Sequence, residues 1–547
     1  MNDRDKNSAQ APLQVVDAEA AAWHDVADVV IVGYGGAGIC AALEAAGAGA
    51  TVIAIDRFAG GGATAMSGGI VYAGGGTSVQ ARAGITDSVD EMAKYLAMEV
   101  GDTVSTDTIR RYCEQSRDNI EWLILHGVPY QDSLYKDKIV YPPDGYSLYY
   151  SGNEKTAEYA QQAKPAARGH RPVGKGMTGN VMFAALKKSA DAKGVKLLVH
   201  SPVTRLVIDA TDRVIGVEIN ALPESAQAQH RKLYQRVNPV MPFNAATAAR
   251  SANEAIRLEQ TQGQRRLIRA RRGVILSGGG FSHNPSMLRE HAPFLERNVS
   301  ALMRMSSLGC NGSGIQLGES VGGVARGMKS MYVGRTMSPP AAFLSGVLVN
   351  GKGERFVNEA AYNSIVGRAI AAQPDGTAWL IVTGSLLGNA VRELLFSGLS
   401  VFKFFGAPLM LNLICGGTKI ATSLEALARK CGIDPATLTQ TIRRYNEAED
   451  FGKPAELRER IEGKRYVAVN FSVPNKFAFT QLFTLGGLNV DEASGLVLRA
   501  DGSAVPGLYA AGRTAFGLCS HNYISGLSIG DCIFTGRRAA RHCMHRN

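Results

Sequence analysis

The sequence predicts an α/β protein: a Rossmann-like nucleotide-binding domain in discontinuous segments, with a helical or α+β cap domain inserted between them. Three observations lead to this expectation. Residues 28–56 follow the order strand, glycine turn, helix, strand and acid. Glycine-bearing strands return at residues 273–281 and 506–513. Between residues 332 and 477 the pattern changes to long apolar helical stretches.

The first unit, residues 28–56, reads DVVIVGYGGAGICAALEAAGAGATVIAID. Gly33 allows a tight turn after the first strand, Gly35 lets the backbone approach a pyrophosphate, and Gly38 lets the helix pack closely on the strand. Asp56 stands at the end of the second strand, where a carboxylate accepts hydrogen bonds from ribose hydroxyls. The unit therefore predicts a dinucleotide site, and by itself it leaves NAD and FAD as alternatives.

Composition narrows the class of protein. The chain has 547 residues, 45% hydrophobic and 20% charged, which is typical of a globular protein with two or three domains. Its eight cysteines form no CxxC pair, so we expect no zinc ribbon, attached haem or iron–sulfur motif, and no metal. We find no signal-peptide pattern and no run of 18 apolar residues, so we expect a cytoplasmic protein.

The net charge of +11 raises the question of an anionic partner. Residues 222–272 hold ten Lys/Arg and three Asp/Glu, so much of the excess lies in one segment. This segment is poor in aromatic residues, so it lacks a stacking platform for bases, and we expect no nucleic-acid partner. We interpret it as a solvated insertion in a hairpin; weak attachment to anionic lipid is the alternative, so we expect at most peripheral membrane contact.

Further along the chain, other glycine-rich stretches are typical of cofactor walls. Residues 60–69 carry hydroxyls at Thr64 and Ser67 beside glycine N–H groups. Residues 130–180 are rich in Tyr, Gly and Pro and predict a loop over a pocket. The strand at residues 273–281 ends in small residues, which let its backbone lie against a ligand.

The pattern divides the chain into four parts. Within the third part, a stretch rich in Phe, Leu and Met would suit the lining for a bulky apolar ligand. The expected parts are a flexible N-terminal tail (1–27), a first nucleotide-binding segment (28–332, with the basic insertion 222–270), a cap domain (333–477) and a second nucleotide-binding segment (478–547).

The motifs GYGGAG…ID, GGGATAMSGG, ILSGGGF and GLYAAGR together resemble those of the flavoprotein family of fumarate reductases and 3-ketosteroid dehydrogenases. The resemblance implies FAD, held by the N- and C-terminal segments together, with the cap closing over the isoalloxazine. It implies that the cofactor is bound by Gly33, Gly35, Gly36, Ala37, Gly38, Asp56, Arg57, Thr64, Ser67, Gly68, Gly69, Val203, Ser277, Gly278, Gly512, Arg513, Ser528 and Ile529.

Within that family, the fumarate reductases carry three arginines that this chain lacks. Glu359 is retained, but Tyr362 and Tyr523 occupy two of the arginine positions, and residues 385–388 contain no arginine for the third. A dicarboxylate without these guanidinium groups would be poorly paired in a dry site. We therefore do not expect fumarate reduction.

The final loop, Asn522-Tyr523-Ile524-Ser525-Gly526, is similar to that of the 3-ketosteroid Δ4-dehydrogenases. The Δ1-dehydrogenases have a Tyr-Pro-Gly-type sequence there. Tyr362 matches a second active-site tyrosine of the Δ4 branch. The alternatives are that Tyr523 is a packed aromatic residue and Tyr362 a surface residue. For the function of the whole chain, the alternatives are a 3-ketosteroid Δ1-dehydrogenase, another flavin-dependent enone reductase, or a non-catalytic flavin-binding protein at a membrane surface.

The resemblance implies a mechanism for desaturating a saturated 3-ketosteroid, a small apolar ketone, with a further electron acceptor that is not identified. Flavin N5 would take hydride from carbon 5 while Tyr362 receives the proton from carbon 4. Ser525 would relay that proton, and Tyr523 with a backbone N–H would polarise the 3-ketone. The roles of the two tyrosines could be exchanged, and the 5α or 5β preference is left open.

Overall fold

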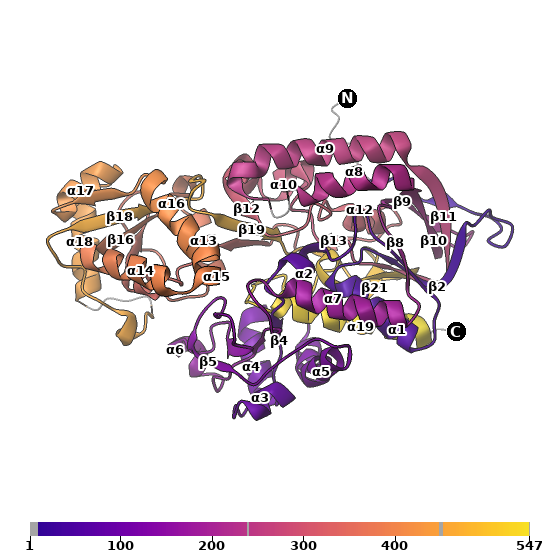
Figure 1. The fold of residues 1–547 in the computed structure, drawn as a ribbon, viewed down its shortest axis with the longest axis horizontal. Helices are drawn as coiled ribbons and strands as arrows, with labels where there is room; N and C mark the ends of the chain where they lie inside the picture. The colour runs from indigo at the N-terminus through magenta and orange to yellow at the C-terminus, as the bar shows by residue number, and fades with distance from the viewer. Residues whose placement is uncertain (1–8, 238–239, 448–451, 546–547) are drawn as a thin grey trace.

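The chain folds into a large α/β lobe and a smaller lobe, the cap, that extends to the left in Figure 1. The structure is a computed structural model that describes residues 9–237, 240–447 and 452–545. Residues 1–8 of the expected tail lie outside the described residues. The expected fold class, α/β with an inserted cap, is confirmed.

The core of the large lobe is a parallel sheet in the order β8-β3-β2-β11-β22. The C-terminal halves of β2, β11 and β22 and the whole of β3 are apolar and buried, as in a sheet with both faces covered. Their C-terminal ends meet at one edge, which is where doubly wound sheets bind ligands. The bounds are β2 (Asp25–Val32), β3 (Val52–Ile55), β8 (Lys196–Leu198), β11 (Gln264–Leu276) and β22 (Ala504–Ala510).

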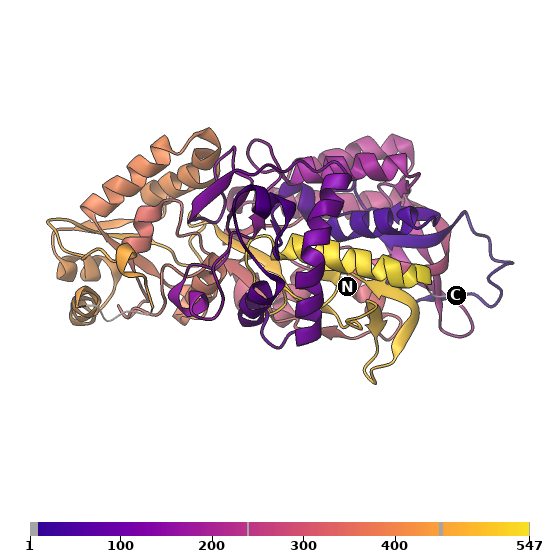
Figure 2. The same ribbon diagram turned by 90° about the horizontal axis from the view of Figure 1, so that it is seen from below.

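Helices from both ends of the sequence cover one face of this sheet. Helix α1 (Gly36–Gly47) contacts both α7 (Gly179–Ala192) and α19 (Leu527–His545). Figure 2 shows α19, in yellow, beside the indigo α1. The N- and C-terminal segments therefore form one domain, as the sequence predicts.

The basic segment is an insertion in a hairpin, as expected, and the insertion is helical. Strands β9 (Val203–Ile208) and β10 (Val214–Ala221) extend the sheet beside β11, and the residues between β10 and β11 form α8 (Glu224–Gln235) and α9 (Ala245–Gln262). These two helices lie above the sheet in Figure 1. Apolar residues on their inner sides are buried, which holds the helices against the lobe; they are Ala226, Leu233, Ala248 and Leu258.

Part of the expected N-terminal tail is also ordered. Strand β1 (Leu13–Gln14) pairs in parallel with β9, and the Gln10 N–H donates to the carbonyl oxygen of Thr204 at 2.9 Å. These backbone bonds add a strand to the edge of the sheet.

A four-stranded sheet, in the order β4-β7-β6-β5, lies below the central sheet in Figure 1. It places the tyrosine-rich residues 130–170 next to the glycine loop at residues 60–69. The strands are β4 (Val71–Tyr72), β5 (Leu134–Lys138), β6 (Leu148–Tyr150) and β7 (Gly169–His170). The accompanying helices are α2 (Gly62–Met66), α3 (Ser78–Arg82), α4 (Val89–Val100), α5 (Thr106–Leu125) and α6 (Ala157–Ala160).

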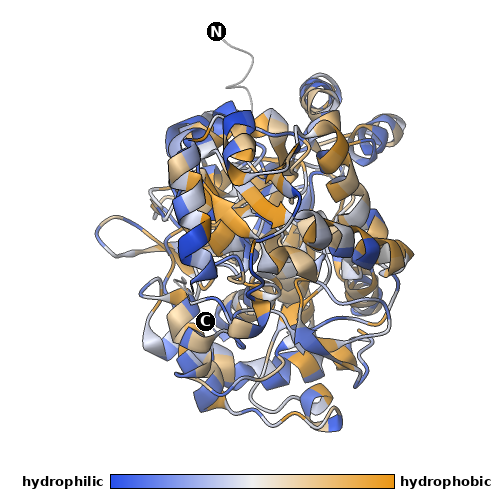
Figure 3. Cartoon of the chain, turned by 90° about the vertical axis from the view of Figure 1, so that its left-hand side faces the viewer, coloured by the Kyte–Doolittle hydropathy of each residue, from blue (hydrophilic) through white to orange (hydrophobic). Residues whose placement is uncertain are grey.

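The cap is an antiparallel sheet in the order β15-β16-β18-β17 with helices packed around it. Figure 3 shows hydrophobic strands in the middle of this end of the molecule, with helices around them that carry hydrophilic faces. The strands are β15 (Val347–Val349), β16 (Trp379–Thr383), β17 (Lys419–Ala421) and β18 (Tyr466–Asn470). The helices are α13 (Asn363–Ala371), α14 (Gly384–Phe396), α15 (Leu399–Val401), α16 (Ala407–Cys415), α17 (Leu424–Cys431) and α18 (Pro435–Asn446).

Two chain segments connect the lobes, and they run side by side. Strand β14 (Met331–Gly334) pairs antiparallel with β19 (Thr480–Thr484), which also pairs with β12 (Leu302–Arg304). The expected domain boundary at 332/333 falls within β14, and the one at 477/478 lies just before β19. Across the described parts of the chain, no helix is long and apolar enough to cross a membrane.

Candidate active site

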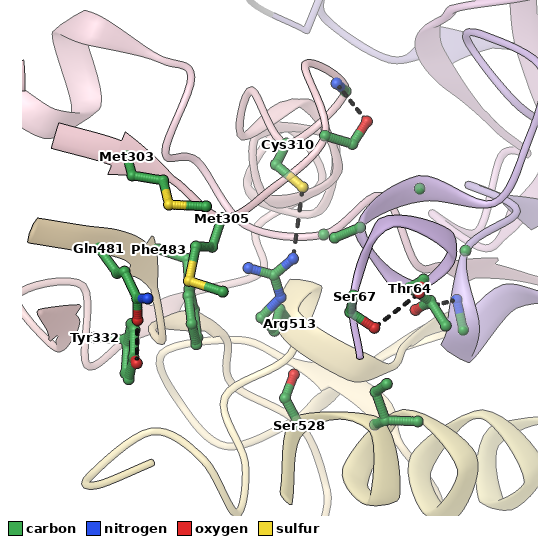
Figure 4. Close-up of a pocket in the computed structure, with 18 of the residues that line it drawn as sticks. Thr64, Ser67, Met303, Met305, Cys310, Tyr332, Gln481, Phe483, Arg513 and Ser528 are labelled. Atoms are coloured by element: carbon green, nitrogen blue, oxygen red, sulfur yellow. Dashed lines mark hydrogen bonds between the residues drawn. The ribbon is translucent and has the colours of Figure 1, made fainter. Parts of the chain in front are cut away.

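One cavity of about 670 Å³ runs from the C-terminal edge of the parallel sheet to the cap. Its size is within the range of about 300–1,000 Å³ that is usual for ligand pockets. The nucleotide-binding loops line one half, and the cap with the final loop lines the other. In Figure 4, Thr64 and Ser67 lie on one side of the pocket and Met303, Gln481 and Tyr332 on the other.

The nucleotide half has the shape of a backbone cradle. Gly33 has φ +97°, and a Cβ there would lie 2.6 Å from the carbonyl oxygen of Ser277, so only glycine fits. A Cβ at Gly35 would meet no atom closer than 4.0 Å and would instead occupy the cavity. The Asp56 carboxylate is fixed at the end of β3 by the N–H groups of Tyr34 (2.9 Å) and Phe58 (2.8 Å). This arrangement fits a dinucleotide whose pyrophosphate lies at the start of α1.

All but two of the residues expected to bind the cofactor line this cavity. The two exceptions are Gly38 and Gly512, which serve close packing instead. A Cβ at Gly38 would lie 2.0 Å from the carbonyl oxygen of Gly33, and one at Gly512 would lie 2.9 Å from the Cβ of Ala37. Both glycines let neighbouring backbone approach α1.

The basic insertion closes the nucleotide end of the cavity, where Tyr234, Met241 and Glu259 are lining residues that sequence reasoning missed. Arg57 donates to Glu259 through two bonds of 2.8 and 2.9 Å. His230 Nε2 lies 2.8 Å from the same carboxylate. Burial raises the pKa of Glu259, but the Arg57 charge and the His230 hydrogen bond outweigh it and hold the pKa below its usual range.

In the other half of the cavity, hydroxyl groups from three separate parts of the chain converge. Tyr362, at the start of α13, and Tyr523 and Ser525, in the final loop, line the cavity. Tyr149 of β6 is fully buried behind Ser525 and does not line it. The Tyr362 and Tyr523 ring centroids are 6.4 Å apart, and Tyr149 Oη lies 3.2 Å from Ser525 Oγ. The structure therefore brings together the three residues expected to be catalytic.

Burial keeps these phenols in their neutral form. It raises the pKa of Tyr362 well above the ordinary tyrosine value, and neighbouring Tyr332, Tyr523 and Tyr149 raise it further, while a hydrogen bond with Ser525 acts in the opposite direction. Burial also raises the pKa of Tyr523, against a weaker lowering effect of the Gly526 N–H. At rest, both side chains can donate a hydrogen bond to a ketone oxygen.

A buried polar network holds together the two segments that carry Tyr362 and Tyr523. Glu99 accepts hydrogen bonds from Asn153 Nδ2 (2.8 Å) and Asn522 Nδ2 (2.6 Å). Asn153 Oδ1 in turn accepts from the Tyr362 N–H at 3.0 Å. Ser364 Oγ donates to the carbonyl oxygen of Tyr523 at 2.9 Å. These bonds connect α4, the start of α13 and the final loop, and so fix the two tyrosines relative to one another.

The walls around the hydroxyl groups are apolar and aromatic. Phe483 lies edge-on to Tyr523 with centroids 5.0 Å apart, and it stacks on Tyr332 at 4.4 Å. Figure 4 shows Met303 and Met305 beside these rings, with Arg513 between them and Thr64. Such walls exclude water, which strengthens hydrogen bonds to a developing oxyanion.

Comparisons with known proteins identify the family. Residues 28–528 match the family model described as an FAD binding domain. The chain belongs to this FAD-binding family. The expected cofactor, FAD, is thereby confirmed, and the cradle described above fits it.

The wider resemblance to fumarate reductases and 3-ketosteroid dehydrogenases is also confirmed. A 3-oxo-5-alpha-steroid 4-dehydrogenase of Comamonas testosteroni is 35% identical over 91% of this chain and 95% of its own length. A 3-oxosteroid 1-dehydrogenase of Mycolicibacterium smegmatis is 26% identical over 94% and 96%. The crystal structure of a 3-ketosteroid-Δ4-(5α)-dehydrogenase of Rhodococcus jostii RHA1, in complex with 4-androstene-3,17-dione, superposes with a TM-score of 0.80 at 29% identity, covering 98% of this chain and 100% of that one.

Proposed function

We propose that this FAD-dependent oxidoreductase is a 3-oxosteroid 4-dehydrogenase that desaturates the carbon 4–carbon 5 bond of a saturated 3-ketosteroid. The observation that carries the proposal is the convergence of Tyr362, Tyr523 and Ser525 between apolar walls at the end of the FAD-binding cavity, with Tyr149 buried behind Ser525. The 35% identity to a 4-dehydrogenase, against 26% to a 1-dehydrogenase, favours carbon 4 over carbon 1.

The chain's own residues supply binding and proton transfer. FAD, when bound, accepts the two electrons that the desaturation removes. A neutral Tyr523 donates a hydrogen bond to the 3-ketone and makes the hydrogen on carbon 4 more acidic. Tyr362 lies next to it and receives that proton as its own phenolic proton passes to Ser525, with which it is hydrogen-bonded. Ser525, within hydrogen-bonding distance of Tyr149, passes the proton away from the substrate.

The test is anaerobic turnover of 5α-androstane-3,17-dione with an artificial electron acceptor, with the product identified by NMR because 1-ene and 4-ene products are isomers. Tyr523→Phe should retain bound FAD and lose about 10²–10⁴-fold in kcat, since it lacks the hydroxyl that polarises the ketone. Near-normal turnover in this variant would contradict the assignment, and a 1-ene product would favour the Δ1 alternative.

A further inference from the structure

The exposed large hydrophobic side chains of the described residues concentrate on one part of the cap. Phe396 and Leu399 are each 83% exposed, and Ile414 is 76% exposed. Leu395 and Ile420 are also exposed in the same stretch of sequence. Single exposed apolar residues are normal, but a concentration such as this marks an interaction surface.

Leu399 and Ile414 belong to a helical segment, Leu399–Cys415, made of α15, a π-helical turn and α16. Leu395 and Phe396 end the preceding helix α14, and Ile420 lies in β17. Leu399, Ala407, Leu411 and Ile414 are all exposed and follow one another at roughly helical spacing, so they share an outer face. Helices on protein surfaces usually place polar residues there. This helix instead presents an apolar face to solvent.

The inner side of the same segment belongs to the substrate half of the cavity. Phe405, Pro408, Leu409 and Asn412 all line that cavity, and Phe405 packs against the cluster around Ile70 and Tyr149. The segment is therefore a wall with the cavity on one side and an apolar, exposed surface on the other.

The charged residues within this segment are cations. No acidic residue occurs between Glu393 and Glu425. Lys403 and Lys419 are the charged residues of that interval, and Arg392 is exposed just before it. Glu393 accepts a hydrogen bond from the Ala341 N–H at 2.7 Å. Apolar side chains flanked by cations are complementary to an anionic lipid surface, where the apolar groups insert and the cations contact headgroups.

We propose that the outer face of residues 395–415 docks on an anionic lipid surface, from which an apolar steroid enters the cavity behind it. The choice of a lipid surface as the partner of this face rests in part on the proposed function, because a saturated ketosteroid partitions into bilayers. Binding to the surface itself requires no turnover, so the two proposals can fail independently.

The test is co-sedimentation of the FAD-loaded, full-length protein with phosphatidylcholine vesicles, with and without phosphatidylglycerol. We expect binding to the anionic vesicles, weakened by salt, and a loss of about tenfold or more in Leu399→Glu. Leu399→Ser, a milder change, should lower the affinity in the same direction. Leu125→Glu is the matched control, because Leu125 is 81% exposed at the end of α5. FAD content shows that each variant is folded.

Equal binding by all variants, or no binding by the unmodified protein, would overturn the proposal. Sedimentation velocity without lipid tests the competing occupant, a second copy of the chain. The proposal would also be overturned if the unmodified protein forms a dimer, does not bind vesicles, and becomes monomeric in Leu399→Glu. If vesicles are bound but no 3-ketosteroid is oxidised, the proposed function fails while the lipid surface stands.

Discussion

At the scale of single residues, the two phenol groups that the proposed reaction uses are buried and neutral. Burial raises the pKa values of both Tyr362 and Tyr523. A neutral phenol is a good hydrogen-bond donor and a poor base, so the two tyrosines suit different steps. Tyr523, which is proposed to polarise the ketone, acts in its neutral resting form. Tyr362, which is proposed to accept the proton from carbon 4, must first lose its own phenolic proton.

This difference predicts how turnover depends on pH. If the acceptor is a tyrosine with a raised pKa, its deprotonated fraction grows as the pH rises, so kcat should increase through neutral pH with no plateau below about 10. Tyr362→Phe should abolish the rise of kcat with pH. Tyr523→Phe should lower kcat at every pH but retain its rise with pH. Steady-state rates of the two variants across pH measure this. A plateau near neutral pH would exclude a tyrosine as acceptor.

Sequence reasoning could find some of these residues and not others. Tyr523 and Ser525 lie in a short, continuous loop, so a resemblance of the local sequence was enough to select them. Tyr149 and Tyr332 reach the site through strand pairing, β6 with β7 and β14 with β19, and nothing in their own neighbourhoods indicates which side faces the cavity. For Tyr149, the available signal was the tyrosine-rich stretch at residues 130–180, which predicted a loop over a pocket but did not single out Tyr149.

At the scale of elements, the basic insertion shows what composition could not predict: the hairpin was expected, but not the two helices or the face they bury. Its charge and Gln/Ala content indicate a solvated segment, yet its helices have apolar faces that are buried on the lobe. The decisive contact is the Arg57–Glu259 pair, which joins residues 202 apart in sequence. No local pattern predicts a pairing over that distance.

The Arg57–Glu259 pair yields a prediction about cofactor retention. Glu259→Gln should leave Arg57, whose side chain is 15% exposed, without its charged partner at the nucleotide end of the cavity. The cost should be below the roughly 3–5 kcal/mol of a fully buried pair. We expect the Kd for FAD, measured by the fluorescence of released flavin, to rise about tenfold or more. Glu254→Gln, an exposed position on the same helix, is the control. If both substitutions change the Kd for FAD equally, the Arg57–Glu259 pair does not contribute specifically to FAD binding.

At the scale of the whole molecule, the site exists because two lobes meet. The sequence predicted the discontinuous nucleotide-binding domain well, because each end of the chain carries its own glycine motif. It could not predict how the cap sits over the cofactor, since that depends on the two connections at β14 and β19. Their antiparallel pairing places Tyr332 of one connection against Phe483 of the other.

Arg335 cross-links these two connections, and removing it should loosen the cap. It follows β14, lines the cavity, and is buried. Its guanidinium donates to the Phe471 carbonyl oxygen at 3.0 Å and to Ala478 and Thr480 on the returning segment. Arg335→Gln cannot span these acceptors, and each buried group left unpaired costs about 1–3 kcal/mol.

We expect Arg335→Gln to bind FAD normally, because none of these hydrogen bonds involves a residue of the nucleotide-binding loops. We expect its KM for the steroid to be raised, because the cap wall of the cavity is held less firmly. Limited proteolysis should cleave the junction around residues 335–346 or 471–479 faster than in the unmodified protein. Arg289→Gln is the control, since its pair with Glu296 is largely exposed and contributes about 0–1 kcal/mol. If KM and cleavage rate are unchanged in Arg335→Gln, the cap is held by the β14–β19 pairing alone.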